Sequence, residues 1–243
     1  MTDLDGTRVL VAGGAQRVGR AIALHLAREG ADVAISYHTS AAPAEATRGE
    51  IEALGRRSLA IAADAAVPAS MAAMVDTAAG ALGGLDAYVH CPSGGFEPRL
   101  PEEIDEALWE AAVGSTAKGF LFAAQAAHRH MAAAGGGVLV AITDVAGIQP
   151  WPRFAAHGAA KAALIHLVKT LALAWGPEGI RVCGVAPGPV LLPDGGERGR
   201  TEETALGRIG SADDVAGAVA YCLTAPFLTG QNVIVDGGRL LRP

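Results

Sequence analysis

Short apolar runs that alternate with helix-forming stretches are the feature that most constrains the fold of this chain. The runs are apolar at consecutive positions, as in TRVLVAG (7–13) and ADVAISY (31–37), so both faces of each strand would be buried. Strands separated by helices pair in parallel, and right-handed crossovers place helices on both sides of the sheet. The sequence therefore predicts an α/β protein with a Rossmann-type doubly wound parallel sheet, formed as a single domain over residues 1–243.

The expected elements alternate along the chain. Strands are expected near residues 7–13, 31–37, 58–63, 85–91, 137–143, 180–186 and 232–238, and helices near 17–29, 43–54, 69–82, 102–112, 116–133, 153–175 and 211–223. The weakly patterned segment 188–210 is rich in glycine, proline and charge, and it is longer than an ordinary connection. Because a long loop after a strand of such a fold often covers a ligand, we predict that residues 188–210 form a substrate-binding lid.

Composition excludes several classes of function. The net charge is −6 and the basic residues are not clustered, so we expect no nucleic-acid partner and no membrane partner. The longest uncharged apolar candidate, residues 131–143, is too short to span a bilayer. Cys91, Cys183 and Cys222 are odd in number and widely spaced, which predicts reduced thiols, no metal site and a cytoplasmic location.

A glycine-rich turn, GGAQRVG (13–19), is the first sign of chemistry. Gly13 allows a tight turn after the first strand, and Gly19 opens a helix whose free amides suit a phosphate. A site for NAD would need an acidic residue at the end of the second strand, but residues 37–40 there read Tyr, His, Thr and Ser. We therefore expect NADPH as the coenzyme, with Arg17 and the hydroxyl groups of Thr39 and Ser40 bonded to its 2′-phosphate.

Further motifs stand in the order typical of the short-chain dehydrogenase/reductase family. AADA (62–65) follows the third expected strand, APGPV (186–190) follows the sixth, and a C-terminal motif covers 206–238. With the glycine turn, the chain resembles this family from about Arg8 to Gly238. Within the family, the GGAQRVG turn, the YHTS end of the second strand and the PVLLP start of the expected lid most resemble the pteridine reductases and their bacterial relatives.

The resemblance implies a set of coenzyme contacts and an assembly. Asp64 and Ala65 would contact the adenine, and the backbone of Pro187–Val190 would contact the nicotinamide amide. A homotetramer built on the helices at 116–133 and 153–175 is also implied. The residues expected to bind NADPH are Gly13, Arg17, Val18, Gly19, His38, Thr39, Ser40, Asp64, Ala65, Cys91, Pro92, Ser93, Lys161, Pro187, Gly188 and Val190.

The catalytic positions depart from the family's pattern, which is Asn, Ser, Tyr and Lys with the Tyr four residues before the Lys. Lys161 is kept, but His157 stands at the Tyr position. Asp144 stands at the Ser position, as in pteridine reductases, and Thr116 stands at the Asn position. The stretch HCPS (90–93) replaces the family's NNAG.

Reduction of a C=O or C=N bond requires a proton donor beside the heteroatom that gains charge. A His157–Asp144 pair can supply this proton, while Lys161 would hold the nicotinamide ribose. We therefore expect an NADPH-dependent oxidoreductase acting on a small planar heterocycle or carbonyl compound, with a substrate site formed by Ser93, Phe96, Asp144 and His157 and with Phe96 stacking on a planar ring. Two alternatives stay open: a non-redox enzyme that uses His157 for isomerisation, elimination or cyclisation, and a catalytically inactive homologue that only binds the coenzyme.

Overall fold

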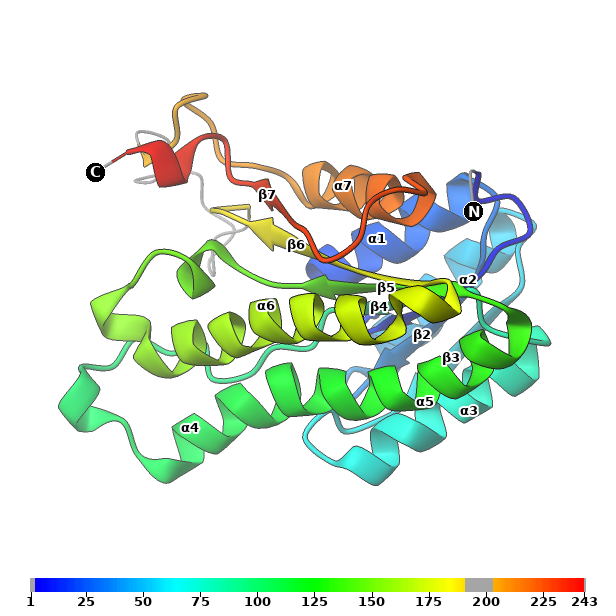
Figure 1. The fold of residues 1–243 in the computed structure, drawn as a ribbon, viewed down its shortest axis with the longest axis horizontal. Helices are drawn as coiled ribbons and strands as arrows, with labels where there is room; N and C mark the ends of the chain where they lie inside the picture. The colour runs from blue at the N-terminus through cyan, green and yellow to red at the C-terminus, as the bar shows by residue number, and fades with distance from the viewer. Residues whose placement is uncertain (1–2, 191–202, 243) are drawn as a thin grey trace.

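A computed structural model describes residues 3–190 and 203–242 as one seven-stranded sheet with helices on both faces (Figure 1). All neighbouring strands are parallel, in the order β3-β2-β1-β4-β5-β6-β7. The strands are β1 (Arg8–Ala12), β2 (Asp32–Tyr37), β3 (Ser58–Ala62), β4 (Ala87–His90), β5 (Gly137–Ile142), β6 (Ile180–Pro187) and β7 (Asn232–Val235). The predicted α/β class and doubly wound sheet are confirmed, and the strand order reverses between β1 and β4.

Helices form a layer on each face of this sheet. They are α1 (Arg17–Arg28), α2 (Ala41–Ala53), α3 (Pro68–Leu82), α4 (Glu106–Val113), α5 (Gly119–Ala134), α6 (Ala155–Trp175) and α7 (Ala212–Thr224). The buried residues of α1, α2 and α7 join one hydrophobic core, and those of α3, α5 and the C-terminal half of α6 join the other. The N-terminal part of α6 packs in a third, smaller cluster with α4. Figure 1 shows α1 and α7 on one side of the strands and α5 and α6 on the opposite side.

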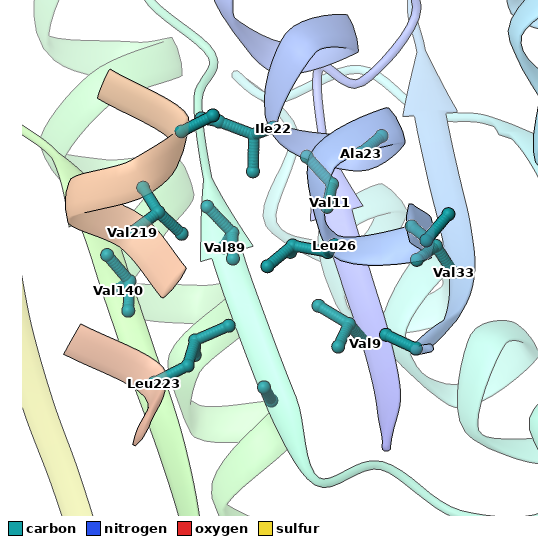
Figure 2. Packing of buried hydrophobic residues seen from close by; sticks show 14 of the residues in the cluster. Val9, Val11, Ile22, Ala23, Leu26, Val33, Val89, Val140, Val219 and Leu223 are labelled. Carbon is teal, nitrogen blue, oxygen red and sulfur yellow. The ribbon is translucent and has the colours of Figure 1, made fainter. Parts of the chain in front are cut away.

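Alternate residues of each strand supply the two cores. Val9 and Val11 of β1 belong to the core beneath α1 and α7, whereas Leu10 belongs to the opposite core, and all three are fully buried. Figure 2 shows the first core, a cluster that contains the two valines together with Ile22 of α1 and Val219 of α7. Burial of consecutive strand residues on both faces is the physical reason for the continuous apolar runs in the sequence.

The predicted elements are confirmed with shifts of a few residues at their ends, and the largest difference concerns the helix expected at 102–112. Residues Pro101–Glu103 form a 3₁₀ turn, and α4 begins only at Glu106. The side chain of Asp105 accepts a hydrogen bond of 2.8 Å from the backbone N–H of Leu108 and so caps the start of α4.

The longest apolar helical segment among the described residues contains α6, whereas the sequence analysis named residues 131–143 as the longest uncharged apolar stretch. Residues Pro152–Glu178 reach a mean hydropathy of 1.2 over 18 residues, so this segment is long and apolar enough, by length and composition alone, to cross a membrane. In the structure α6 packs against β6 and α4 as part of the helical layer. This segment is not an uncharged stretch, because Lys161 and Lys169 lie within it.

Most of the predicted lid lies outside the described residues, which exclude 191–202. The described ends of the 188–210 segment are bonded to each other and to the turn that follows β7. The N–H of Gly210 donates to the carbonyl of Pro189 at 3.0 Å, and the N–H of Leu206 donates to that of Gly237 at 3.1 Å. A lid over the substrate stays a prediction.

Candidate active site

A cavity of about 400 Å³ lies at the carboxyl ends of β1, β4, β5 and β6. Ligands of doubly wound sheets bind at these ends, beside the point where the strand order reverses. The cavity gathers most of the residues predicted from sequence: Gly13, Arg17, Val18, Gly19, Cys91, Pro92, Ser93, Phe96, Asp144, His157, Lys161, Pro187, Gly188 and Val190. The glycine turn and the expected catalytic group therefore share one site.

A second cavity of about 290 Å³ adjoins the first and shares Gly13 with it. It contains three further predicted residues, namely His38, Asp64 and Ala65. Nε2 of His38 lies 3.8 Å from Oδ2 of Asp64. Thr39 and Ser40 are not among the residues that line either cavity.

The glycine turn is shaped for an anion that approaches the backbone closely. Gly13 has φ 71°, in the left-handed region, and a Cβ atom at Gly19 would run into the carbonyl of Gly13. At the start of α1 the N-cap residue, Gln16, makes no side-chain cap, and the first turn carries no acidic residue. The first-turn amides are thus available to a phosphate group, so the turn fits the diphosphate of a dinucleotide coenzyme.

Arg17 departs from ordinary backbone geometry. Among the described residues it is the only non-glycine with a positive φ, at 51°. Such a conformation is unfavourable for a side chain with a Cβ atom and is concentrated at functional sites. Arg17 lines the first cavity together with His157 and Lys161, and it is not among the residues that line the second. The arginine thus lies on the catalytic side of the glycine turn.

His157 and Asp144 come together as predicted. Nε2 of His157 lies 3.4 Å from Oδ2 of Asp144, while Nδ1 is buried and has no hydrogen-bond partner among the described residues. The other carboxylate oxygen of Asp144 accepts a hydrogen bond of 2.7 Å from the N–H of Ala146, which fixes the carboxylate at the end of β5. A carboxylate accepts only, so the proton between the pair belongs to Nε2.

Lys161 follows His157 by one turn of α6, and both side chains are buried. Its Nζ donates a hydrogen bond of 2.8 Å to the carbonyl of Ile142. Burial lowers the pKa of Lys161, and the negative charge of Asp144 opposes that shift. Burial also raises the pKa of the nearby Cys91 thiol to about 12, so this cysteine is a neutral group and not a nucleophile.

An aromatic wall closes the side of the cavity that lies next to His157. Phe96 stacks on Phe154 with ring centres 4.7 Å apart, and it meets the imidazole of His157 edge to face at 4.8 Å. Trp151 also lines the cavity, and its buried Nε1 has no partner among the described residues. One face of Phe96 is therefore occupied by Phe154, and stacking of a substrate on its remaining surface stays a prediction.

A buried polar network behind the site was not expected from sequence. The hydroxyl of Tyr88 lies 2.7 Å from Nδ1 of His90, and Nε2 of His90 lies 3.1 Å from the carbonyl of Ser115, in a π-helical turn at Gly114–Lys118. A carbonyl only accepts, so Nε2 carries the proton and the Tyr88 hydroxyl donates to Nδ1. Burial lowers the pKa of His90 to about 3. The sequence does carry one sign of the Tyr88–His90 contact, because residues two apart on a strand place their side chains on the same face.

The same π-helical turn carries Thr116, which stands at the family's Asn position. Its side chain is fully buried, and its hydroxyl has no partner among the described residues. Thr116 does not line either cavity, so we assign it no contact with a ligand.

Comparison with known proteins identifies the family of the chain. The family model described as enoyl-(acyl carrier protein) reductase matches residues 13–239. The chain is 34% identical to L-rhamnose 1-dehydrogenase (NAD(P)(+)) from a Sphingomonas species, over 97% of this chain and 96% of that protein. It is 32% identical to the 3-oxoacyl-(acyl-carrier-protein) reductase of Staphylococcus epidermidis, over 96% and 98% of the two chains.

Solved structures give the same result. A short-chain dehydrogenase from Burkholderia cenocepacia in complex with NADP superposes with a TM-score of 0.92 at 36% identity, covering 98% of this chain and 99% of that one. An acetoin dehydrogenase from Enterobacter cloacae superposes with a TM-score of 0.91 at 32% identity, covering 100% and 97%. The matches extend over nearly the whole length of each protein. The chain therefore belongs to the short-chain dehydrogenase/reductase family of oxidoreductases.

Proposed function

We propose that this protein is an NADPH-dependent reductase that acts on a C=O or C=N bond of a small carbonyl compound or planar heterocycle. The observation that carries the proposal is that His157, Asp144 and Lys161 line the same cavity as the glycine turn. A proton donor and a dinucleotide-binding turn in one cavity suit a reaction in which a hydride and a proton reach the same substrate.

The coenzyme would be held by groups on both sides of the glycine turn. The free amides at the start of α1 fit its diphosphate. The backbone of Pro187–Val190, which lines the cavity, would contact the nicotinamide amide, as the family resemblance implies. Lys161 would hold the nicotinamide ribose through its ammonium group. When bound, NADPH supplies the hydride. The NADP complex of the Burkholderia relative supports this choice of coenzyme.

His157 would hold the proton that the substrate heteroatom receives. Oδ2 of Asp144 lies 3.4 Å from Nε2 and can accept its proton in a hydrogen bond. In a doubly protonated ring Nδ1 is a second N–H donor, and it has no partner among the described residues. Its burial in the cavity wall limits competition from water, so Nδ1 can donate to a substrate oxygen or nitrogen.

The aromatic wall supports a flat or compact substrate. Phe96 and Trp151 face the cavity beside His157, and the unpartnered indole N–H could donate to a second polar atom of the substrate. Oxidised pteridines, which the sequence resemblance suggests, satisfy both conditions. α-Hydroxy ketones and vicinal diketones offer the second polar atom, and the acetoin dehydrogenase neighbour carries an α-hydroxy ketone in its name.

The decisive experiment is to follow NADPH absorbance while the purified protein meets a panel of oxidised pteridines, cyclic imines, diketones and simple ketones. A His157→Phe variant serves as the matched control, because it keeps Lys161 and the glycine turn. We expect the parent to consume NADPH with at least one compound, and the variant to bind NADPH without turnover. Equal turnover by the two proteins would remove His157 from the mechanism.

A non-redox reaction is the second candidate, because a His–Asp pair can move protons without any coenzyme. Product analysis separates the two functions. A reductase converts one NADPH for each molecule of product, whereas an isomerase, lyase or cyclase forms product with no change in NADPH. Restoring tyrosine with His157→Tyr provides a further comparison. If that variant becomes a carbonyl reductase and the parent is none, the non-redox or binding-only function is correct.

A cytoplasmic homotetramer is part of the proposal. Leu173 of α6 is 83% exposed and Phe122 of α5 is 36% exposed, so both of the helices expected at the interface present apolar side chains. Sedimentation equilibrium gives the assembly mass. Changing Leu173 to Glu should dissociate the assembly if α6 lies in the interface, and a tetramer unaffected by that change would argue against it.

A further inference from the structure

The segment 91–100, which follows β4, contains no helix or strand, yet it contributes to both cavities. Pro92 and Ser93 line both of them. Phe96 lines the first cavity and meets the imidazole of His157 edge to face, with ring centres 4.8 Å apart. The position of this segment therefore affects both parts of the candidate site.

One hydrogen bond holds the middle of this segment in place. The N–H of Gly94 donates to Oγ of Ser115 at 2.8 Å. Among the described residues, this is the only hydrogen bond that the backbone of residues 92–98 makes. The next backbone bonds on either side come from the N–H groups of Cys91 and Arg99. Loss of the Ser115 hydroxyl would therefore leave the backbone of 92–98 with no hydrogen bond to the rest of the described chain.

Ser115 is itself held on two sides. Its carbonyl accepts a hydrogen bond of 3.1 Å from Nε2 of His90, which joins the π-helical turn to β4. Its hydroxyl donates to the carbonyl of Ala111, in the last turn of α4, at 2.8 Å. Because that bond uses the hydroxyl proton, the oxygen is left to accept the N–H of Gly94. The Ser115 hydroxyl is thus a fixed acceptor for one point of the segment.

Two glycines allow the segment to lie directly on α4. A Cβ atom at Gly94 would come within 2.6 Å of the carbonyl oxygen of Ala111, and one at Gly95 would come within 2.7 Å of Cβ of Ala112. Any larger residue at either position would push the segment away from the helix. The close approach brings the N–H of Gly94 within reach of Ser115.

The same turn of α4 also packs against the helix that carries His157. Ala112 belongs to a small hydrophobic cluster with Ala156 and Ala160 of α6. His157 directly follows the first of these two alanines in sequence. The segment that carries Phe96 and the helix that carries His157 are therefore fixed to the same turn of α4.

We infer that Ser115 is a positioning residue, whose hydroxyl fastens residues 92–98 to α4 and so holds Phe96 beside His157. The inference rests on the proposed function in taking these two rings as part of the substrate site. If the segment were loose, only the fraction of molecules with the segment in place could bind ligands, and the apparent affinity would fall by that fraction. The chemical step in the fully bound protein would be unchanged.

The first measurement needs no activity. It follows hydrogen exchange of residues 92–98 by mass spectrometry, in a peptide whose protected amide is that of Gly94. Ser115→Ala should speed this exchange about tenfold, because the amide loses its one acceptor. Ser115→Thr keeps a hydroxyl and should restore the slow exchange.

Thr77→Ala is the matched control. Thr77 of α3 makes the same kind of bond within a helix, from its hydroxyl to the carbonyl of Ala73 at 2.7 Å, and it lines neither cavity. This variant loses a helix hydroxyl as Ser115→Ala does, but no segment is attached to it. Its exchange in residues 92–98 and its ligand affinities should equal those of the parent.

The second measurement uses NADPH and the compound of the panel that the parent protein reduces. For Ser115→Ala, the product of the NADPH dissociation constant and the substrate KM should rise about five- to tenfold, the effect expected from one hydrogen bond. Its kcat at saturation should equal that of the parent. A loss of correctly folded protein would give the opposite pattern, with a lower kcat and unchanged affinities. Ser115→Thr should keep the constants of the parent.

The inference is overturned if Ser115→Ala leaves the exchange of residues 92–98 unchanged, or if it lowers kcat without weakening either ligand. It is also overturned if Ser115→Thr behaves like Ser115→Ala, since the hydroxyl would then play no part. A protein that binds no NADPH and reduces no compound, but whose exchange responds as expected, overturns the proposed reductase and leaves the anchoring role of Ser115 standing.

Discussion

Arg8 and Asp86 join the amino ends of β1 and β4, the two strands between which the strand order reverses. The guanidinium of Arg8 donates to both oxygens of Asp86, at 2.7 and 2.6 Å, and the backbone N–H of Arg8 adds a third bond of 2.8 Å. Burial raises the pKa of Asp86, but the hydrogen bonds from Arg8 outweigh it and hold the pKa below its usual value. The pair fixes the sheet at the end opposite the cavity.

Asp86→Asn should lower the free energy of unfolding at pH 7 by about 1–2 kcal/mol, because the amide keeps one acceptor and loses the charge. A carboxylate with a lowered pKa stabilises the folded state above its unfolded pKa, near pH ~4, and that stabilisation is lost as the pH falls further. The difference between parent and variant should therefore shrink in urea titrations carried out below about pH 4. Glu110→Gln, at an exposed carboxylate of α4, is the control and should change little.

Gly19→Ala should abolish coenzyme binding and destabilise the fold. The new Cβ atom would run into the carbonyl of Gly13, and this backbone cannot retreat without opening the turn that holds the diphosphate. The matched control is Gly49→Ala on α2, where a Cβ atom would meet nothing within 4 Å. That change should stabilise the protein by about 0.5–1 kcal/mol through helix propensity. Thermal unfolding with and without NADPH measures both effects, and a Gly19→Ala protein that NADPH still stabilises would contradict the prediction.

The architecture could be predicted from sequence because each strand carries its own evidence. Residues 9–13 and 33–35 are apolar at consecutive positions, as expected of strands that are buried on both faces. The start of α4 was missed because its signal, the cap at Asp105, lies inside a stretch that is rich in helix-forming residues on both sides.

The candidate site was predictable where a short motif fixes local geometry, as with the glycine turn and the spacing of His157 and Lys161. It was not predictable where segments far apart in sequence meet. The contact of His90 with Ser115 joins residues 25 positions apart, and no local pattern encodes it. Arg17 has a left-handed backbone angle, which is rare for an arginine and cannot be read from the sequence GGAQRVG. The cavity that Arg17 lines was therefore not predictable from sequence.

His90→Phe should destabilise the fold at pH 7 by about 2–5 kcal/mol, because it leaves the buried Tyr88 hydroxyl without its partner and removes the bond to the Ser115 carbonyl. Tyr88→Phe removes only the first bond and should cost less. The double variant should lose less unfolding free energy than the sum of the two single variants, because the Tyr88 hydroxyl that His90→Phe leaves unpaired is absent from it. Chemical denaturation of the three variants tests this, and additive losses would argue against a shared network.

The same histidine gives the parent protein a pH dependence of known sign. With a folded pKa of about 3, His90 stays neutral in the native state, whereas an unfolded histidine is protonated below about pH 6.5. The unfolded chain therefore binds the extra proton, and stability falls as the pH decreases from about 6.5 by up to about 1.4 kcal/mol per pH unit. His90→Phe should lack this component, so its unfolding free energy should change less between about pH 6.5 and about pH 5. Parallel curves for the two proteins would show that His90 titrates alike in both states.

The final prediction concerns the pair at the centre of the cavity. If His157 supplies the proton, His157→Ala and Asp144→Ala should each slow single-turnover hydride transfer by about 10²–10⁴-fold, the usual contribution of general acid catalysis. The double variant should lose far less than the product of the two factors, because the residues act as one unit. Asp144→Asn keeps the acceptor for the N–H of Ala146 but lacks the charge. It should therefore match Asp144→Ala in rate while retaining the parent's stability, and a variant as fast as the parent would show that the charge of Asp144 plays no part in the reaction.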